Sequence, residues 1–278
     1  MSATSTPATT AKPRLAVGNV TQLRVARSEW TKLRSLRSTR WALFVTLLLT
    51  IGIGLLVAVV FEARWPSLAL EDKFRYFLNP LRFPLAGINL AQLSIGVLGV
   101  LVITGEYTTG MIRSTFCAVP KRLPVLWAKA GVFALVAFAV SLPAVLIVFF
   151  ASEAILSSRH IQIAFSHPGV PRAVIGAALF LTVMGLFGLG LGAIVRHTAG
   201  GIVTLVAIMF VLTPIVSLLP TSWANAINPY LPSEAAGVLW TIRPDSHTLS
   251  PWAGFGLFCG YTALTLAIGA VLLRRRDT

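Results

Sequence analysis

Few residues of this sequence have the types and spacing that catalysis or metal binding requires. There is no H-E-x-x-H zinc motif, no G-x-S-x-G nucleophile motif and no Walker A phosphate-binding loop. The histidines, His160, His167, His197 and His247, are scattered over predicted loops on both sides of the membrane, which argues against one metal site. Cys117 and Cys259 have no disulfide or metal-site spacing. We therefore expect no catalytic residue, no metal and no cofactor bound by this chain, and we do not expect an enzyme.

The composition is that of a membrane protein. Of 278 residues 56% are hydrophobic and 12% charged, with a mean hydropathy of +0.81, whereas soluble domains carry about 25% charged residues. The formal net charge of +14 would also suit a nucleic-acid binder. However, the basic residues cluster at the ends of apolar runs, where Lys and Arg orient membrane proteins. We predict contact with a lipid bilayer and none with nucleic acid.

Six apolar runs predict an all-α integral membrane protein. A bilayer needs about 20 apolar residues per helix, and the runs that meet this length fall at about 41–61, 85–104, 129–150, 172–195, 202–219 and 252–273. The transmembrane domain thus covers 41–273, between tails at 1–18, predicted to be disordered, and 274–278. With the N-terminus inside, 16 of the 23 Lys and Arg residues lie on the inner side. We predict a multi-pass protein of the cell membrane with both termini in the cytoplasm.

A basic amphipathic helix is predicted over 19–40, before the first span. Leu23, Ala26, Trp30 and Leu33 recur at helical spacing, and basic residues occupy the other sides. This pattern is typical of a helix that lies in the membrane interface. An ordinary basic segment that only fixes the orientation of the first span is the alternative.

The connection 220–251 is long and partly apolar. Leu231-Pro232-Ser233-Glu234 has the composition of a helix start, followed by an apolar stretch from Ala235 to Ile242 and by Pro244. About ten apolar residues are too few to cross a bilayer. A re-entrant segment before the last span and a helix on the membrane surface both remain open.

Polar and small residues in the spans suggest two uses. Asn89 and Gln92 share one face of span two with Gly96 and Gly99, which fits either a translocation path or interhelical packing. Span four carries glycines on one face, at Gly185, Gly188 and Gly192, and these predict close helix packing.

Two motifs and the span layout resemble a known family. The first motif is SEWTKLRS, residues 28–35, and the second is GEYTTGMIRSTFCAVPKR, residues 105–122. Both resemble segments of the actinobacterial type-2 ABC exporter permeases, as do the six-span layout and the run Tyr230-Leu231-Pro232. The motifs identify an architecture without identifying a substrate.

The resemblance implies a surface that contacts a separate ABC ATPase subunit. One part would be the N-terminal helix, with Glu29, Trp30 and Lys32. The other would be a cytoplasmic coupling loop at 105–128 that contains a short helix from Tyr107 to Phe116. Its matching residues are Glu106, Gly110, Arg113, Pro120 and Arg122. A plain local ion pair between Glu106 and Arg113 that only caps the span is the alternative.

These patterns lead to one expected function and one alternative. We expect the membrane permease subunit of an ABC exporter, paired with a second permease chain as a homodimer or heterodimer. It would move a small amphipathic substrate outward, such as a drug, lipid or peptide, and ATP would bind only to the partner subunit. The alternative is a membrane scaffold or sensor that transports nothing and recruits a cytoplasmic partner.

Overall fold

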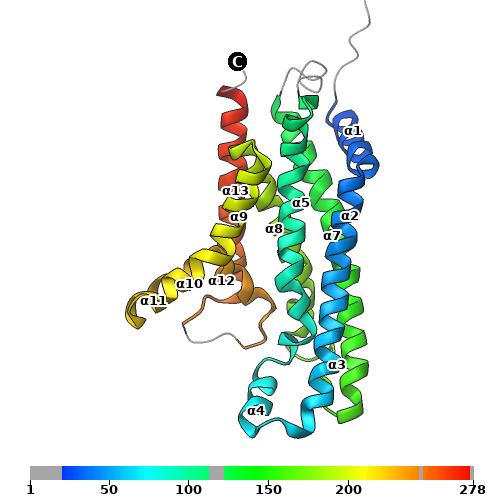
Figure 1. The fold of residues 1–278 in the computed structure, drawn as a ribbon, viewed down its shortest axis with the longest axis vertical. Helices are drawn as coiled ribbons and strands as arrows, with labels where there is room; N and C mark the ends of the chain where they lie inside the picture. The colour runs from blue at the N-terminus through cyan, green and yellow to red at the C-terminus, as the bar shows by residue number, and fades with distance from the viewer. Residues whose placement is uncertain (1–20, 113–121, 244–246, 276–278) are drawn as a thin grey trace, which may run out of the picture.

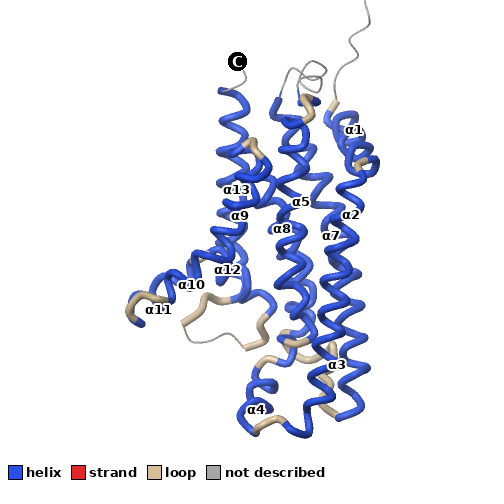
Figure 2. The backbone as a smooth tube through the Cα atoms, viewed as in Figure 1, coloured by secondary structure: helices blue, strands red, loops and turns tan. Residues whose placement is uncertain are grey.

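The computed structural model describes residues 21–112, 122–243 and 247–275, and these residues form helices, turns and loops without a strand (Figure 2). The α-helices are α1 (Gln22–Ser35), α2 (Arg37–Leu48), α3 (Gly54–Arg64), α4 (Leu70–Leu78), α5 (Ile88–Thr108), α7 (Arg122–Leu156), α8 (Val170–Val195), α9 (Thr198–Val206), α10 (Leu212–Ser217), α11 (Thr221–Ile227), α12 (Pro232–Gly237) and α13 (Pro251–Arg275). The predicted tail 1–18 lies outside these residues.

Within the described residues, six helices are long and apolar enough to cross a membrane. They cover Arg37–Ser67, Pro84–Thr108, Leu123–Arg159, Val170–Val195, Thr198–Ser217 and Pro251–Arg275. The predicted all-α membrane fold with six spans is therefore confirmed. The first and third helices extend well beyond the predicted limits, because the chain stays helical past the apolar run, through Arg64 and Leu156 respectively.

The helices form an elongated bundle with α8 at its centre. Of the membrane-spanning windows, that of α8 is 78% buried, against 22% for the first span. Helix α1, the adjoining ends of α5 and α7, and the C-terminal end of α13 lie at one end of the bundle, and α4 lies at the other (Figure 1). We call these the α1 end and the α4 end. The two ends of the described chain therefore lie on the same side, as an even number of spans requires.

Glycines allow α5 and α8 to pack with their backbones close together. A Cβ atom added at Gly99 would lie 1.9 Å from the carbonyl oxygen of Gly185, and one at Gly188 would lie 2.1 Å from that of Gly96. A Cβ atom at Gly192 would lie 2.7 Å from Ile103. The close packing predicted for the span-four glycines is confirmed.

The N-terminal helix differs from the prediction in its end and in its buried face. Helix α1 stops at Ser35, because Leu36 takes an extended conformation with ψ of 122°, and α2 then starts the first span. The predicted apolar stripe is divided: Leu33 is 5% exposed, whereas Leu23 and Trp30 are 63% and 46% exposed. The buried face consists of Val25, Glu29 and Leu33, so a carboxylate lies in the middle of it.

The predicted coupling loop at 105–128 is wrong at both of its ends. Helix α5 continues to Thr108, so Glu106 and Tyr107 belong to the span helix and no separate helix starts at Tyr107. Gly110 has a φ of +71°, a left-handed conformation that suits glycine, and it turns the chain away from α5. Helix α7 starts at Arg122. The connection is therefore shorter than predicted, and 113–121 lies outside the described residues.

The segment 220–251 returns to the bundle. Helix α12 starts at Pro232, as the sequence predicts, and continues as a short 3-10 segment, Val238–Trp240. Ala235 and Leu239 are fully buried. A Cβ atom added at Gly176 of α8 would lie 2.6 Å from Leu239, and one at Gly254 of α13 would lie 2.4 Å from the carbonyl oxygen of Ala235. The segment is thus folded against α8 and α13.

Candidate functional site

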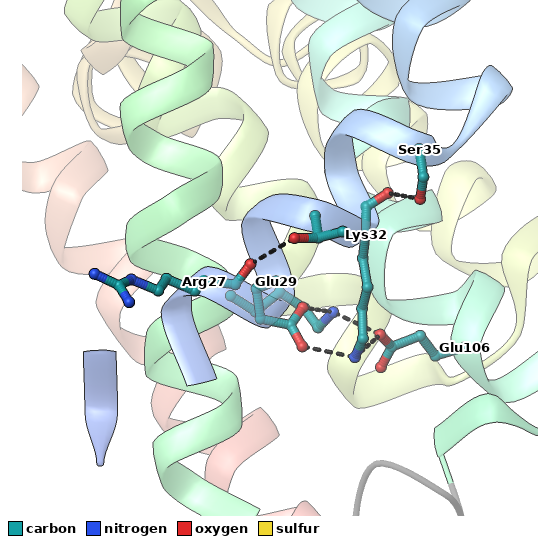
Figure 3. Close-up of polar contacts among 7 residues, drawn as sticks. Arg27, Glu29, Lys32, Ser35 and Glu106 are labelled. Carbon is teal, nitrogen blue, oxygen red and sulfur yellow. Dashed lines mark hydrogen bonds and ion pairs between the residues drawn. The ribbon is translucent and has the colours of Figure 1, made fainter. Parts of the chain in front are cut away.

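Four charged side chains form a closed ring where α1, α5 and α7 meet. Lys32 donates hydrogen bonds to Glu29 Oε1 at 2.7 Å and to Glu106 Oε1 at 2.9 Å (Figure 3). Lys129 of α7 donates to Glu29 Oε2 at 2.5 Å and to the same Oε1 atom of Glu106 at 2.9 Å. We call these four residues the ion ring. It contains two positive and two negative charges and connects three helices that are far apart in the sequence.

The ion ring is almost completely removed from solvent. Glu29, Glu106 and Lys129 are 2%, 4% and 3% exposed, and the side chain of Lys32 is 20% exposed. Val25, Val125 and Ala128 form an apolar cluster between α1 and α7 beside it. Ionised groups are costly to bury unless they are paired. The closed alternation of charges provides that pairing, and loss of any one member would leave an opposite charge buried without its full complement of partners.

The environment of Lys32 favours its charged form. Burial alone would lower the pKa of Lys32, but its hydrogen bonds to Glu29 and Glu106, together with their negative charges, raise it above its ordinary value. Lys32 therefore stays protonated throughout the physiological pH range.

The same end of α5 also contacts α8 and α9, and Arg196 connects it to α13. Thr198, at the start of α9, donates a hydrogen bond to Thr104 at 2.9 Å. The guanidinium of Arg196, just after α8, lies 5.1 Å from the ring centroid of Tyr107 and donates to the carbonyl oxygen of Leu272 in α13 at 3.0 Å. A displacement of this end of α5 would therefore be felt by most of the bundle.

The predicted coupling residues divide into three groups. Glu29, Lys32 and Glu106 come together in the ion ring. Trp30 points away from the protein interior, since it is 46% exposed, and Gly110 forms the turn after α5. Arg113, Pro120 and the side chain of Arg122 lie outside the described residues, as does the predicted pair of Glu106 with Arg113. The partners that the structure gives Glu106 are lysines of α1 and α7.

Lys129 is the member of the ring that sequence reasoning missed. In the sequence it is one of the 23 Lys and Arg residues and lies at the start of the apolar run 129–150. A usable signal was present, because Val125, Lys129 and Phe133 are spaced by four residues on one helical face. Val125 and Phe133 are 3% and 2% exposed. Val25, Glu29 and Leu33 show the same pattern. A charge in the middle of an apolar stripe predicts a buried partner of opposite sign.

A polar cleft of about 1020 Å³ lies toward the other end of α5. Asn89 and Gln92, the predicted translocation residues, both line it, together with residues of the α9–α10 span and of the segment that contains α12. Charged groups at its walls are Arg82, Glu234 and Arg243. We call this the polar cleft. Burial raises the pKa of Glu234 above its ordinary value.

The glycines of α5 do not belong to the polar cleft. A Cβ atom added at Gly96 would lie 2.8 Å from Leu205, and Gly99 lies against Gly185. The predicted face of α5 is therefore divided. Asn89 and Gln92 line an open cleft, whereas Gly96 and Gly99 pack against neighbouring helices.

Comparisons with known proteins do not identify the family. No model of a known protein family matches the chain, and a search of curated proteins gives no significant match. The resemblance to exporter permeases therefore depends on the two motifs and the span layout.

Proposed function

We propose that this chain is the membrane permease subunit of an ABC exporter in the cell membrane, with both termini in the cytoplasm. A separate ABC ATPase subunit would bind at the α1 end, and a second permease chain would complete the transport unit. The substrate would be a small amphipathic molecule that moves outward through the polar cleft.

The observation that carries this proposal is the ion ring. It fastens an interfacial helix, α1, to two span helices, so a force applied to α1 is passed directly to α5 and α7. Packed helices move as rigid units rather than bending gradually. Helix α5 also lines the polar cleft at its other end. One rigid element thus joins a surface suited to a cytoplasmic partner with a cleft suited to a solute.

The charge of the α1 end agrees with a cytoplasmic location. Helix α1 and the end of α13 carry exposed basic residues, including Arg27, Arg34 and Arg275. Basic residues are enriched on the cytoplasmic side of membrane proteins. An exposed Trp30 among them provides an apolar anchor of the kind that often dominates protein interfaces.

The test is copurification with an ABC ATPase. The tagged chain is coexpressed with an ABC ATPase subunit of the same organism and purified in mild detergent, and vanadate-sensitive ATP hydrolysis is measured in the eluted complex. We expect stable coelution, and we expect Trp30→Ala to reduce it while the fold is retained, because this side chain is exposed. Trp252→Ala, at a tryptophan that is 60% exposed at the start of α13, is the matched control.

Two results would contradict the proposal. One is an ATPase that fails to coelute with the wild-type chain. The other is a complex whose stability and ATP hydrolysis are the same with and without Trp30. The first result would favour a membrane scaffold or sensor without an ATPase. The second would contradict the binding of the ATPase at Trp30 of the α1 end.

A further inference from the structure

A second, mostly apolar groove lies between α3 and α4, at the α4 end of the bundle. Its volume is about 570 Å³, within the range of small-molecule sites. It is lined by Val57, Val60 and Phe61 of α3 and by Tyr76 and Phe83. The proposed exporter mechanism does not use this groove.

The floor of the groove is rigid. The rings of Phe61 and Phe83 are stacked with centroids 4.0 Å apart, and Tyr76 lies 5.0 Å from Phe61. Tyr76 is 1% exposed, and its hydroxyl donates a hydrogen bond to the carbonyl oxygen of Ile161 at 2.8 Å. The groove therefore exists before any ligand binds, so a ligand would not have to order these side chains.

The rim of the groove carries an excess of positive charge. Arg64 and Arg82 line it together with one carboxylate, Asp72. In the part of the chain that the structure describes, neither arginine forms an ion pair. Arg159 nearby shows the contrast, because it binds Glu62 at 2.6 Å. Two arginines beside an apolar groove are complementary to a molecule with an acidic head and an apolar tail.

The surroundings of the groove favour a lipid over a water-soluble ligand. Helix α4 exposes Leu70, Phe74 and Phe77, which lie on one side of the helix, at 86%, 64% and 59%. A short helix with such a face, at the end of membrane-spanning helices, belongs in the membrane interface. The aromatic residue Trp65 between α3 and α4 is of the type enriched at that level.

We propose that the groove between α3 and α4 binds an anionic phospholipid. One acyl chain would lie on the aromatic floor, and the phosphate would lie between Arg64 and Arg82. Arg82 also lines the polar cleft, so the bound headgroup would stand at the border of the two cavities. This site does not depend on whether the chain transports anything.

The test uses Trp65 as a local reporter, since its ring is 5.5 Å from that of Phe61. The full chain in a neutral detergent is titrated with phosphatidylglycerol brominated on its acyl chains, or with phosphatidylcholine brominated in the same way. Bromine quenches tryptophan fluorescence at short range. Subtracting the signal of Trp65→Phe isolates the quenching of Trp65 from that of the other tryptophans.

We expect half-maximal quenching of Trp65 at a concentration of phosphatidylglycerol about tenfold lower than that of phosphatidylcholine, because two arginines face the acidic headgroup. The double variant Arg64→Gln/Arg82→Gln should lose this preference. Arg27→Gln/Arg34→Gln removes the same charge at the α1 end and should keep it. Equal quenching by both lipids, or an unchanged preference in a folded double variant, would overturn the proposal.

Discussion

The two ends of α5 meet opposite environments. At the α1 end, Thr104 is fully buried and Glu106 is 4% exposed, and the neighbouring side chains hold the helix through ionic and hydrogen bonds. Toward the α4 end, Asn89 is exposed at the wall of the polar cleft. Charges are paired and closed off at one end, and polar groups face open space at the other. One helix thus has an end with buried, paired charges and an end with polar side chains at an open cleft.

The difference also shows how to separate structural from functional polar residues. A buried charge whose removal leaves a counter-charge unpaired destabilises the fold strongly. An exposed amide that lines a cleft contributes little to stability. Substitutions in the ion ring should therefore mainly change the free energy of unfolding. Substitutions of the amides in the polar cleft should mainly change substrate-stimulated ATP hydrolysis.

The largest effect is expected at the centre of the ion ring. Glu106→Gln removes the carboxylate that both lysines contact, and should lower the free energy of unfolding by about 3–5 kcal/mol, the range for breaking a buried ion pair. Unfolding in mixed detergent micelles measures this. Glu62→Gln, which breaks the exposed pair with Arg159, is the control and should leave stability nearly unchanged. Equal effects of the two substitutions would mean that the ion ring is not tightly packed.

A smaller effect is expected in the packing between α5 and α8. Gly99→Ala places a Cβ atom 1.9 Å from the carbonyl oxygen of Gly185, so the helices must separate. We expect a loss of about 1–3 kcal/mol, typical of overpacked sites. Gly105→Ala, on the same helix, has nothing within 4 Å of the added atom and serves as the control. A neutral Gly99→Ala would show that this contact is looser than the structure indicates.

The stabilisation that Lys32 contributes to the ion ring should be lost at alkaline pH. The pKa of Lys32 is raised in the folded protein above its ordinary value of 10.5. The stabilisation from Lys32 is therefore fully present below that ordinary value and is lost as the pH rises through the raised one. The difference in thermal stability between the wild type and Lys32→Met should stay constant from about pH 7 to 9 and shrink at higher pH. A difference that declines already between pH 7 and 9 would contradict this.

The smallest effect on stability is expected in the polar cleft. The double variant Asn89→Ala/Gln92→Ala should unfold within about 0.5 kcal/mol of the wild type, the usual range for surface substitutions. The amides of both side chains donate only to carbonyl groups of their own chain segment, those of Ala86 and Asn89. Substrate-stimulated ATP hydrolysis in the complex should nevertheless fall. A stable variant with full stimulation would remove the polar cleft from the proposed transport path.

The sequence was a good guide to the elements whose apolar pattern is local. Spans of about 20 apolar residues predicted all six membrane helices, and the spacing of Gly185, Gly188 and Gly192 predicted a close helix contact. The start of α12 at Pro232 followed from the local residue types alone. In each case the deciding information lies within a few turns of one helix.

The sequence was a poor guide where distant residues decide. The ion ring joins Glu29 to Lys129 across 100 positions, and neither residue indicates its partner. The apolar stripe of Leu23, Ala26, Trp30 and Leu33 predicts another buried face of α1 than the one observed, which consists of Val25, Glu29 and Leu33. That face is buried because Lys129 of α7 compensates the charge. Likewise, α5 continues through Glu106 because lysines of other helices neutralise it.

A double-mutant cycle on Glu106 and Lys129 tests most directly whether the ion ring acts as one unit. The free energies of unfolding are measured for the wild type, Glu106→Gln, Lys129→Met and the double variant. Both residues are buried and in contact, so each single substitution should lower the free energy of unfolding. The loss in the double variant should be smaller than the sum of the two single losses by on the order of 2 kcal/mol, within the range measured for coupled neighbours. Strictly additive effects would contradict the ion ring as one unit and, with it, the link from α5 to α7.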